Sequence, residues 1–114
     1  MKFNEFNNVE YYLGENAQDN WNLFDKSKEI NENYIWFHLN SFASPYVIMY
    51  ATMDDIKTMS ESYLNYGANL CLNNSKYSYL RDTKIIYNEL KKLNKGSKVG
   101  EIIISGKKKL MKVV

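Results

Sequence analysis

The residues with the clearest chemical capacity are lysines in the C-terminal third of the chain. A first group interleaves lysines with two glycines and comprises Lys91, Lys92, Lys95, Gly96, Lys98 and Gly100, and a second group comprises Lys107, Lys108 and Lys109. A lysine ammonium group neutralises a phosphate as a point charge, and a glycine lets the backbone approach a phosphate closely. This composition predicts a flexible cationic loop that contacts a phosphate-bearing polymer.

Charge is strongly divided along the chain. Residues 1–75 contain four lysines and ten acidic residues, a net charge of −6, whereas residues 76–114 contain ten lysines and Arg81 against three acidic residues, a net charge of +8. Such asymmetry is typical of proteins that bind a polyanion. The alternative is that lysines on exposed strand faces and edges only guard against aggregation.

Other reactive residue types do not assemble into a catalytic or metal-binding pattern. His38 is the only histidine, and no cysteine lies at metal-ligand spacing from it. Cys71 falls on the apolar stripe of an expected helix, and the pair Asp54–Asp55 fits a helix cap. No glycine pattern for a nucleotide cofactor occurs in the sequence. We therefore expect no catalytic residues, no metal and no cofactor.

The bulk composition indicates a single globular domain. The 114 residues are 45% hydrophobic and 25% charged, which is ordinary for a folded domain. A lone cysteine excludes an internal disulfide and favours a reducing compartment. The N-terminal residues lack the apolar core of a signal peptide, and the longest apolar run, residues 46–51, is too short to span a bilayer. We expect one domain over residues 1–114, located in the cytoplasm and not in a membrane.

The first elements can be predicted from local patterns. Residues 9–13 are β-prone and end at Gly14, which indicates a strand followed by a turn. An N-cap pattern at Asn16 predicts a short helix that carries Phe24. The polar residues 25–33 lack periodicity and are expected to form a surface loop.

Two further strands are predicted at residues 35–39 and 46–50, joined by a short link. Along the first strand, Trp36 and His38 share one face because side chains alternate in a strand. Both rings could present to a nucleic-acid base, or both could pack beneath a helix. Burial is favoured since large aromatic side chains dominate small cores, with His38 and Tyr46 reaching the surface at the edge of the strands.

The second half is predicted to contain the longest helix. A Thr-x-x-acid cap at Thr52 and apolar residues at helical spacing predict a helix from about Thr52 to Asn73. Residues 83–88 follow as a strand, and residues 101–114 are expected to form a closing hairpin with a turn at Gly106. The sum is an α+β fold, with a mostly antiparallel sheet of about five or six strands and one main helix packed on one face.

Three stretches of the chain together resemble one family. Residues 14–20 (GENAQDN) resemble a G-x-N-A-x-x-N signature, residues 35–38 and 44–47 (IWFH and SPYV) resemble a WFH…SxHV core, and residues 85–104 resemble a YT…KK…G…KPG segment. In this order and spacing, the stretches resemble the NFACT RNA-binding domain. That domain occurs in large factors of ribosome-associated quality control, which are related to fibronectin-binding protein A-like proteins, and in a small stand-alone protein.

The resemblance implies a non-catalytic module that binds structured RNA, with tRNA or the ribosome favoured. The RNA contacts that we predict are the two lysine groups with Gly96 and Gly100, together with Asn16, His38 and Tyr46. A protein-interaction adaptor that meets an acidic partner through its basic face is the alternative from another class. DNA is a third interpretation, because phosphate contacts alone do not tell the two polymers apart.

The chain departs from the family pattern at three positions. Tyr34 stands where the family usually has an acidic residue, and Tyr46 stands where it usually has histidine. Asn88 replaces a threonine that usually follows the strand tyrosine. The loss of the acid and the histidine argues against a proton-transfer role at those two positions.

Overall fold

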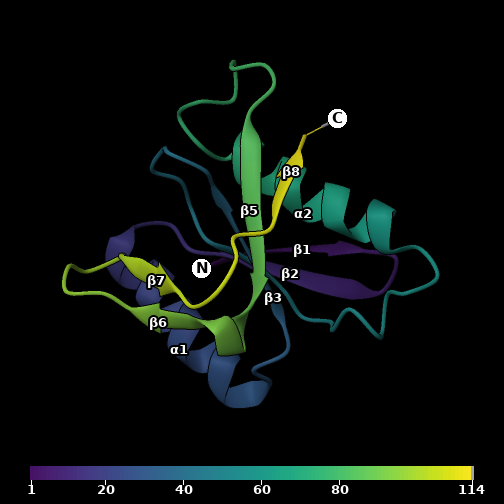
Figure 1. Ribbon diagram of the computed structural model, residues 1–114. Coiled ribbons are helices and arrows are strands. Elements are labelled where there is room, and N and C mark those ends of the chain that lie inside the picture. Colours follow the sequence, from purple (N-terminus) through teal and green to yellow (C-terminus); the bar gives the residue numbers. More distant parts are fainter. Residues whose placement is uncertain (114) are drawn as a thin grey trace.

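An antiparallel sheet of six strands organises residues 1–113, the part of the chain that the computed structural model describes (Figure 1). In spatial order the strands are β1 (Lys2–Phe6), β2 (Val9–Leu13), β4 (Val47–Met49), β3 (Ile35–Leu39), β5 (Lys84–Glu89) and β8 (Leu110–Lys112). A second sheet pairs β6 (Leu93–Lys95) with β7 (Ile102–Ile104). The helical elements are α1 (Ala17–Ile30), α2 (Ser60–Asn73) and a 3-10 turn, η1 (Leu90–Lys92). The predicted α+β class and mostly antiparallel sheet are confirmed.

One face of the sheet packs against α2. Ile35 and Phe37 of β3 and Val47 of β4 are buried, and they form one core with Leu64 and Ala68 of α2. Because side chains alternate along a strand, the neighbouring residues of each strand point to the other face. Burying a side chain such as that of Phe37 contributes about 1.5–3 kcal/mol. The sequence analysis predicted both features of this face, namely the main helix that covers it and the alternation of side chains along β3.

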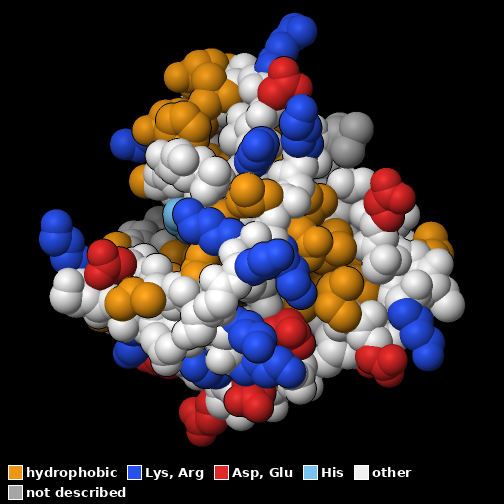
Figure 2. Space-filling model, viewed as in Figure 1, with side chains coloured by type: hydrophobic (Ala, Val, Ile, Leu, Met, Phe, Trp, Pro, Cys, Tyr) orange, Lys and Arg blue, Asp and Glu red, His pale blue; other side chains and the backbone are white. Residues whose placement is uncertain are grey.

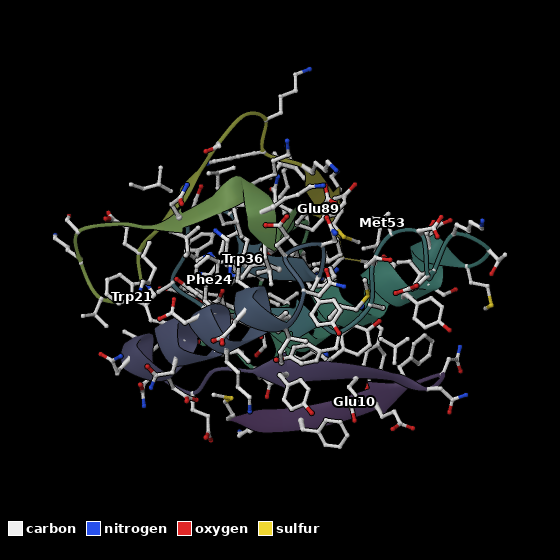
Figure 3. The ribbon with its side chains drawn as sticks, turned by 90° about the horizontal axis from the view of Figure 1, so that it is seen from below. Glu10, Trp21, Phe24, Trp36, Met53 and Glu89 are labelled. Atoms are coloured by element: carbon white, nitrogen blue, oxygen red, sulfur yellow. The ribbon has the colours of Figure 1, made fainter. Side chains whose placement is uncertain are left out.

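The opposite face is covered by α1 and by the β6–β7 hairpin, a layer that the prediction of one main helix omits. Trp36 and Ile48 of the sheet pack here with Leu23 and Phe24 of α1 and with Leu93 of β6. Figure 3 shows Phe24 and Trp36 close together beside α1. Trp36 is 2% exposed, so the favoured burial of this ring is confirmed.

Helix α1 is longer than predicted, because residues 25–30 continue it instead of forming a loop. Its inner face in this part is polar. Ser27 is completely buried with its Oγ 2.6 Å from the hydroxyl oxygen of Tyr50, and the Lys28 ammonium group donates to the Leu93 carbonyl at 2.8 Å. Hydrogen bonds replace apolar contacts here, so no apolar period marks the helix in the sequence.

Helix α2 is shorter than predicted and begins at Ser60 instead of Thr52. The predicted cap does form, since the Thr52 amide donates to Oδ2 of Asp55 at 2.9 Å and the Asp55 amide donates to Oγ1 of Thr52 at 3.1 Å. It stabilises a run of turns rather than a helix. Ile56 is buried whereas Met59 is half exposed, so the apolar period is interrupted before the helix starts.

Strand β1 is absent from the sequence-based prediction. It pairs with β2 through a two-residue turn at Asn7 and Asn8, whose φ angles are 47° and 66°. Asparagine tolerates this left-handed region better than other residues with a Cβ atom, and the pair suits the tight turn of a hairpin. The pair Asn7–Asn8 is therefore the sequence feature that could have predicted the β1–β2 hairpin.

The predicted hairpin over residues 101–114 is wrong. Strand β7 pairs with β6, and β8 pairs with β5 at the edge of the main sheet. Gly106 does turn the chain, with a φ of +84°, but the Ser105 amide donates to the Lys92 carbonyl at 2.7 Å and the chain then continues toward β5. Figure 1 shows this crossing segment, residues 105–109, in front of β5.

Cys71 is a core residue, as predicted. It is completely buried, and burial raises the pKa of its thiol to about 12, so the thiol stays protonated at neutral pH. Residues 1–113 hold no group of three or more His, Cys, Asp or Glu side chains placed to bind a metal ion. Within the same residues, neither helix combines the length and the apolarity needed to cross a bilayer.

We expect Gly67→Ala to lower the free energy of unfolding, although alanine is the better helix former by about 1 kcal/mol. A Cβ atom at residue 67 would lie 2.5 Å from Cζ of Phe37, whose ring is completely buried. Overpacking of this kind costs about 1–3 kcal/mol, and the Phe37 ring is enclosed by the residues of the core. Chemical denaturation measures the change, with the exposed Ser62→Ala in the same helix as control. A Gly67→Ala protein as stable as the wild type would contradict this account.

Candidate functional site

A cavity of about 930 Å³ lies at the end of the sheet where β2 and β3 finish and β4 begins. Four stretches that are distant in the sequence line it, namely residues 13–17, 39–46, 74–77 and 99–102. Trp36 and His38 of β3 also line it, from the face of the sheet that α1 covers. Its volume falls in the range of about 300–1,000 Å³ that is typical of ligand pockets.

The turn into α1 explains the G-x-N-A-x-x-N signature. Asn16 caps the helix, since its Oδ1 accepts the Asp19 amide at 2.9 Å. Asn20 is buried, and its Oδ1 accepts the Tyr46 amide at 3.1 Å. A Cβ atom at residue 14 would lie 1.9 Å from that oxygen, so only glycine leaves room for it. The signature thus fastens the start of α1 to the start of β4.

Tyr46 connects this turn to the β6–β7 hairpin. Its hydroxyl donates to the carbonyl of Gly100, and burial raises the pKa of Tyr46 well above its usual range. The predicted surface position of Tyr46 is wrong, because the residue is 1% exposed and its ring packs edge-on against Trp36 at 5.5 Å between centroids. The indole N–H of Trp21 holds the same segment by donating to the Glu101 carbonyl at 3.1 Å.

The two glycines of the lysine-rich segment have structural explanations. A Cβ atom at Gly96 would lie 2.0 Å from Oε1 of Glu101, and this oxygen accepts the Ser97 amide at 2.8 Å. Gly100 has a φ of +91°, and a Cβ atom there would lie 3.0 Å from Cβ of Ala17. The segment is therefore a hydrogen-bonded hairpin packed on α1, instead of the flexible loop that the sequence predicts.

Two of the predicted phosphate-binding lysines form ion pairs. Nζ of Lys95 lies 2.8 Å from Oδ2 of Asp25 and 5.0 Å from the centre of the Trp21 ring. Nζ of Lys91 lies 3.5 Å from Oε2 of Glu89. Pairs that solvent reaches contribute about 0–1 kcal/mol, so these two lysines are weaker candidates for binding a polyanion.

The other predicted lysines are exposed and form no ion pair within residues 1–113. We call them the C-terminal lysine cluster after their place in the sequence; they are Lys92 on η1, Lys98 in the β6–β7 hairpin, and Lys107, Lys108 and Lys109 on the crossing segment. Asn88 fixes the backbone of the crossing segment. It is buried, its Nδ2 donates to the Lys107 carbonyl at 3.2 Å, and its Oδ1 accepts the Lys109 amide at 3.5 Å. The Tyr87 amide donates to the Lys109 carbonyl at 2.9 Å. Figure 2 views the molecule from the side of the crossing segment and shows side chains coloured as lysine or arginine gathered over the middle of that side.

His38 and Trp36 form a stacked pair beside the cavity, with ring centroids 5.4 Å apart and planes 7° apart. Nδ1 of His38 lies 2.8 Å from the Leu39 carbonyl oxygen, which can only accept, so Nδ1 carries the hydrogen and Nε2 is an acceptor. Burial lowers the pKa of His38, and the hydrogen bond to Leu39 only partly opposes this. His38 is therefore neutral at neutral pH and offers an acceptor, not a cation.

The cavity brings together five of the twelve predicted RNA-contact residues, namely Asn16, His38, Tyr46, Gly100 and Lys108. The other seven lie on η1, the hairpin and the crossing segment, outside its lining. Among the lining residues that the sequence analysis misses are Lys2, Phe42, Lys76 and Tyr77. An aromatic residue in the proline-containing link, Phe42, was a usable signal, whereas an isolated lysine such as Lys2 or Lys76 carries no local pattern.

Comparison with known protein families identifies the family to which the chain belongs. The family model of the NFACT protein RNA binding domain matches residues 1–111. The chain belongs to this family. The predicted resemblance is confirmed, and the chain is an RNA-binding module of the NFACT type.

A solved structure has the same fold as this NFACT domain. It is the C-terminal part of the fibronectin/fibrinogen-binding protein from Streptococcus suis, with a TM-score of 0.71 and 24% sequence identity. The likeness covers 92% of this chain and 40% of that chain, so the NFACT domain spans less than half of the structure it matches. A comparison with curated protein sequences found no match.

The departures from the NFACT pattern have defined positions in the structure. Tyr34 stacks on Tyr50, with ring centroids 4.7 Å apart, and it does not line the cavity. Tyr46 occupies the position at which the NFACT pattern usually has histidine, and it uses its hydroxyl to hold Gly100. Asn88 anchors the crossing segment. Two of the three replacements therefore position the C-terminal segments.

We expect the pKa of His38 to lie below its ordinary value of about 6.5, because the folded ring is partly desolvated. Between the folded pKa and about 6.5, the unfolded chain binds more protons than the native domain, so the free energy of unfolding falls as the pH decreases through that window. NMR titration of the single imidazole measures the pKa directly. His38→Gln removes the titration and serves as the control for denaturation experiments. A pKa at or above the ordinary value would contradict the neutral, acceptor state of the ring.

Proposed function

We propose that residues 1–114 act as one non-catalytic domain that binds structured RNA through the C-terminal lysine cluster. The natural ligand in this proposal is tRNA or ribosomal RNA, and the setting is translation or ribosome quality control in the cytoplasm. Membership of the NFACT RNA-binding family supports RNA as the ligand. The position of the lysines supports the choice of the C-terminal lysine cluster as the RNA-binding surface.

The observation that carries the proposal is the fixed position of Lys107, Lys108 and Lys109. Their backbone is bound by Asn88 and Tyr87, so the three side chains extend from an anchored segment over β5 and not from a free tail. Lys108 also reaches the lining of the cavity. Cations on an ordered backbone lose less conformational freedom when they bind a phosphate chain.

The lysine cluster by itself fits any polyanion, including DNA and an acidic protein surface. Lysine reads charge and not base identity, and only contacts to shape or to the 2′-hydroxyl tell RNA from DNA. The choice of RNA therefore comes from the family, and the choice of surface comes from the geometry. The two parts of the proposal can be tested separately.

The electrostatic part predicts a steep dependence of RNA affinity on salt. If the five lysines of the cluster each release a counterion, the affinity falls by about two to three decades between about 50 and about 200 mM salt. Filter binding or fluorescence anisotropy over a salt series measures the slope. An affinity that is flat across this range would remove the electrostatic model.

A matched pair of variants locates the surface. Lys107→Gln/Lys109→Gln should reduce the slope of log affinity against log salt by about 1.4–1.8, because two phosphate contacts are lost. Lys26→Gln/Lys57→Gln removes the same charge from the acidic part of the chain and should leave the slope nearly unchanged. Equal effects of the two double variants would show that only net charge matters, which would contradict the proposed surface.

The identity of the ligand is tested in cells. The protein is crosslinked, recovered and treated with ribonuclease, deoxyribonuclease or neither before the bound molecules are analysed. The proposal predicts that ribonuclease alone releases the partners and that the attached RNA is tRNA or ribosomal RNA. Partners that survive both nucleases would favour the adaptor, and release by deoxyribonuclease would favour DNA.

A further inference from the structure

The cavity contains polar groups that the lysine cluster does not explain. The indole N–H of Trp36 is buried and has no hydrogen-bond partner within residues 1–113. Buried polar groups in folded proteins nearly always have a partner, so an unpaired donor beside a cavity points to a ligand or an ordered water. Next to it in the stacked pair, Nε2 of His38 is an acceptor without a protein partner in the same residues. The stacked pair thus places an unpartnered acceptor beside the cavity and an unpartnered donor buried just behind its lining.

An aromatic pair lies on another wall of the same cavity. The rings of Phe42 and Tyr77 are 4.6 Å apart and both residues contribute to the lining. Phe42 remains 39% exposed, which leaves part of a large apolar ring available to a ligand. Planar bases stack on exposed aromatic side chains in proteins that bind single-stranded nucleic acid.

The charges of the lining favour an anion. Lys2, Lys76 and Lys108 line the cavity, and none of them forms an ion pair within residues 1–113. The two carboxylates of the lining are both engaged. Glu15 binds the amino group of Met1 at 2.9 Å, and Glu101 accepts the Ser97 amide at 2.8 Å. Figure 2 shows the histidine beside a side chain coloured as lysine or arginine.

We infer that the cavity binds one unpaired nucleotide, whose base enters it and whose phosphate meets the three lysines. An aromatic wall, the acceptor nitrogen of His38 and a cationic rim together match a base joined to a phosphate. This inference rests on the proposed function for the source of the nucleotide, because RNA bound along the lysine cluster would bring an unstacked base to Lys108. The same chemistry is present in a free nucleoside monophosphate.

Stacking is tested with two matched aromatic variants. Phe42→Ala removes the exposed ring of the lining, and Tyr79→Ala removes a ring that is 74% exposed and lies outside the lining. Single-stranded oligoribonucleotides and fully paired RNA are titrated into each protein. Phe42→Ala should weaken single-strand binding by about tenfold or more and leave paired RNA unaffected, whereas Tyr79→Ala should match the wild type. Equal behaviour of the two variants would overturn the inference.

The unpaired indole provides a second readout that does not depend on affinity for RNA. The Trp36 indole N–H signal is assigned in nitrogen-15 NMR spectra by its loss in Trp36→Phe, which keeps a large ring in the core. Nucleoside monophosphates at millimolar concentration should shift this signal, and inorganic phosphate should not. Absence of a shift with both mononucleotides and oligonucleotides would overturn the inference.

Comparing these ligands tells RNA from a free nucleotide as the source of the bound base. It also tests the nucleotide site separately from RNA binding by the lysine cluster. If the same shift of the Trp36 signal needs a much lower concentration of oligoribonucleotide than of mononucleotide, RNA is the source of the bound nucleotide. If the two ligands need equal concentrations, a free nucleotide is the source. If RNA binds with the predicted salt slope but neither cavity readout changes, the nucleotide site is refuted and the proposed function stands. If mononucleotides shift the indole signal but RNA does not bind, the proposed function fails and the site remains.

Discussion

The hydrogen bond from the Tyr46 hydroxyl to the Gly100 carbonyl is the contact on which the candidate site depends. The amide of Tyr46 is itself held by Asn20, and Gly100 packs against Ala17 at the start of α1. One residue thus joins the sheet, the first helix and the hairpin that carries Lys98. Because Tyr46 is buried between these layers, its hydroxyl needs a partner, and the hairpin supplies one in the backbone carbonyl of Gly100.

The separation of charge along the sequence is reorganised in space by a small number of local bonds. Asp25 and Glu89 engage Lys95 and Lys91, so part of the cationic segment is neutralised by the protein itself. The lysines of the crossing segment are not neutralised in this way. The neutral side chain of Asn88 binds the backbone of the segment, and the ammonium groups of its lysines form no ion pair within residues 1–113. A carboxylate in place of Asn88 would hold the same backbone poorly and would attract the lysines that the proposed RNA ligand needs. The anchoring is therefore polar but uncharged, which keeps the surface cationic.

Sequence patterns predict this molecule well where burial follows a period and poorly where polar side chains do the packing. The alternation of Ile35, Trp36 and Phe37 is regular, and both faces of β3 are as predicted. Residues 25–30 are helical and bury Ser27 with a hydrogen bond to Tyr50, a kind of packing that no hydrophobic pattern reports. The lysine groups and His38 were found from their residue types, but the cavity is lined by Lys2 and Lys76, which come from distant parts of the sequence. Such long-range convergence has no signal in a local stretch of sequence.

Tyr46→Phe tests the central claim most directly, because it removes one hydroxyl and keeps the ring in the core. Hydrogen exchange of the Gly96 and Glu101 amides, compared with that of β3 amides, reports whether the hairpin is still held. The account predicts exchange about five- to tenfold faster in the hairpin, as expected for the loss of one hydrogen bond of about 1 kcal/mol, unchanged exchange in β3, and weaker RNA binding. Unchanged protection of the hairpin amides, or full RNA affinity in the variant, would contradict it.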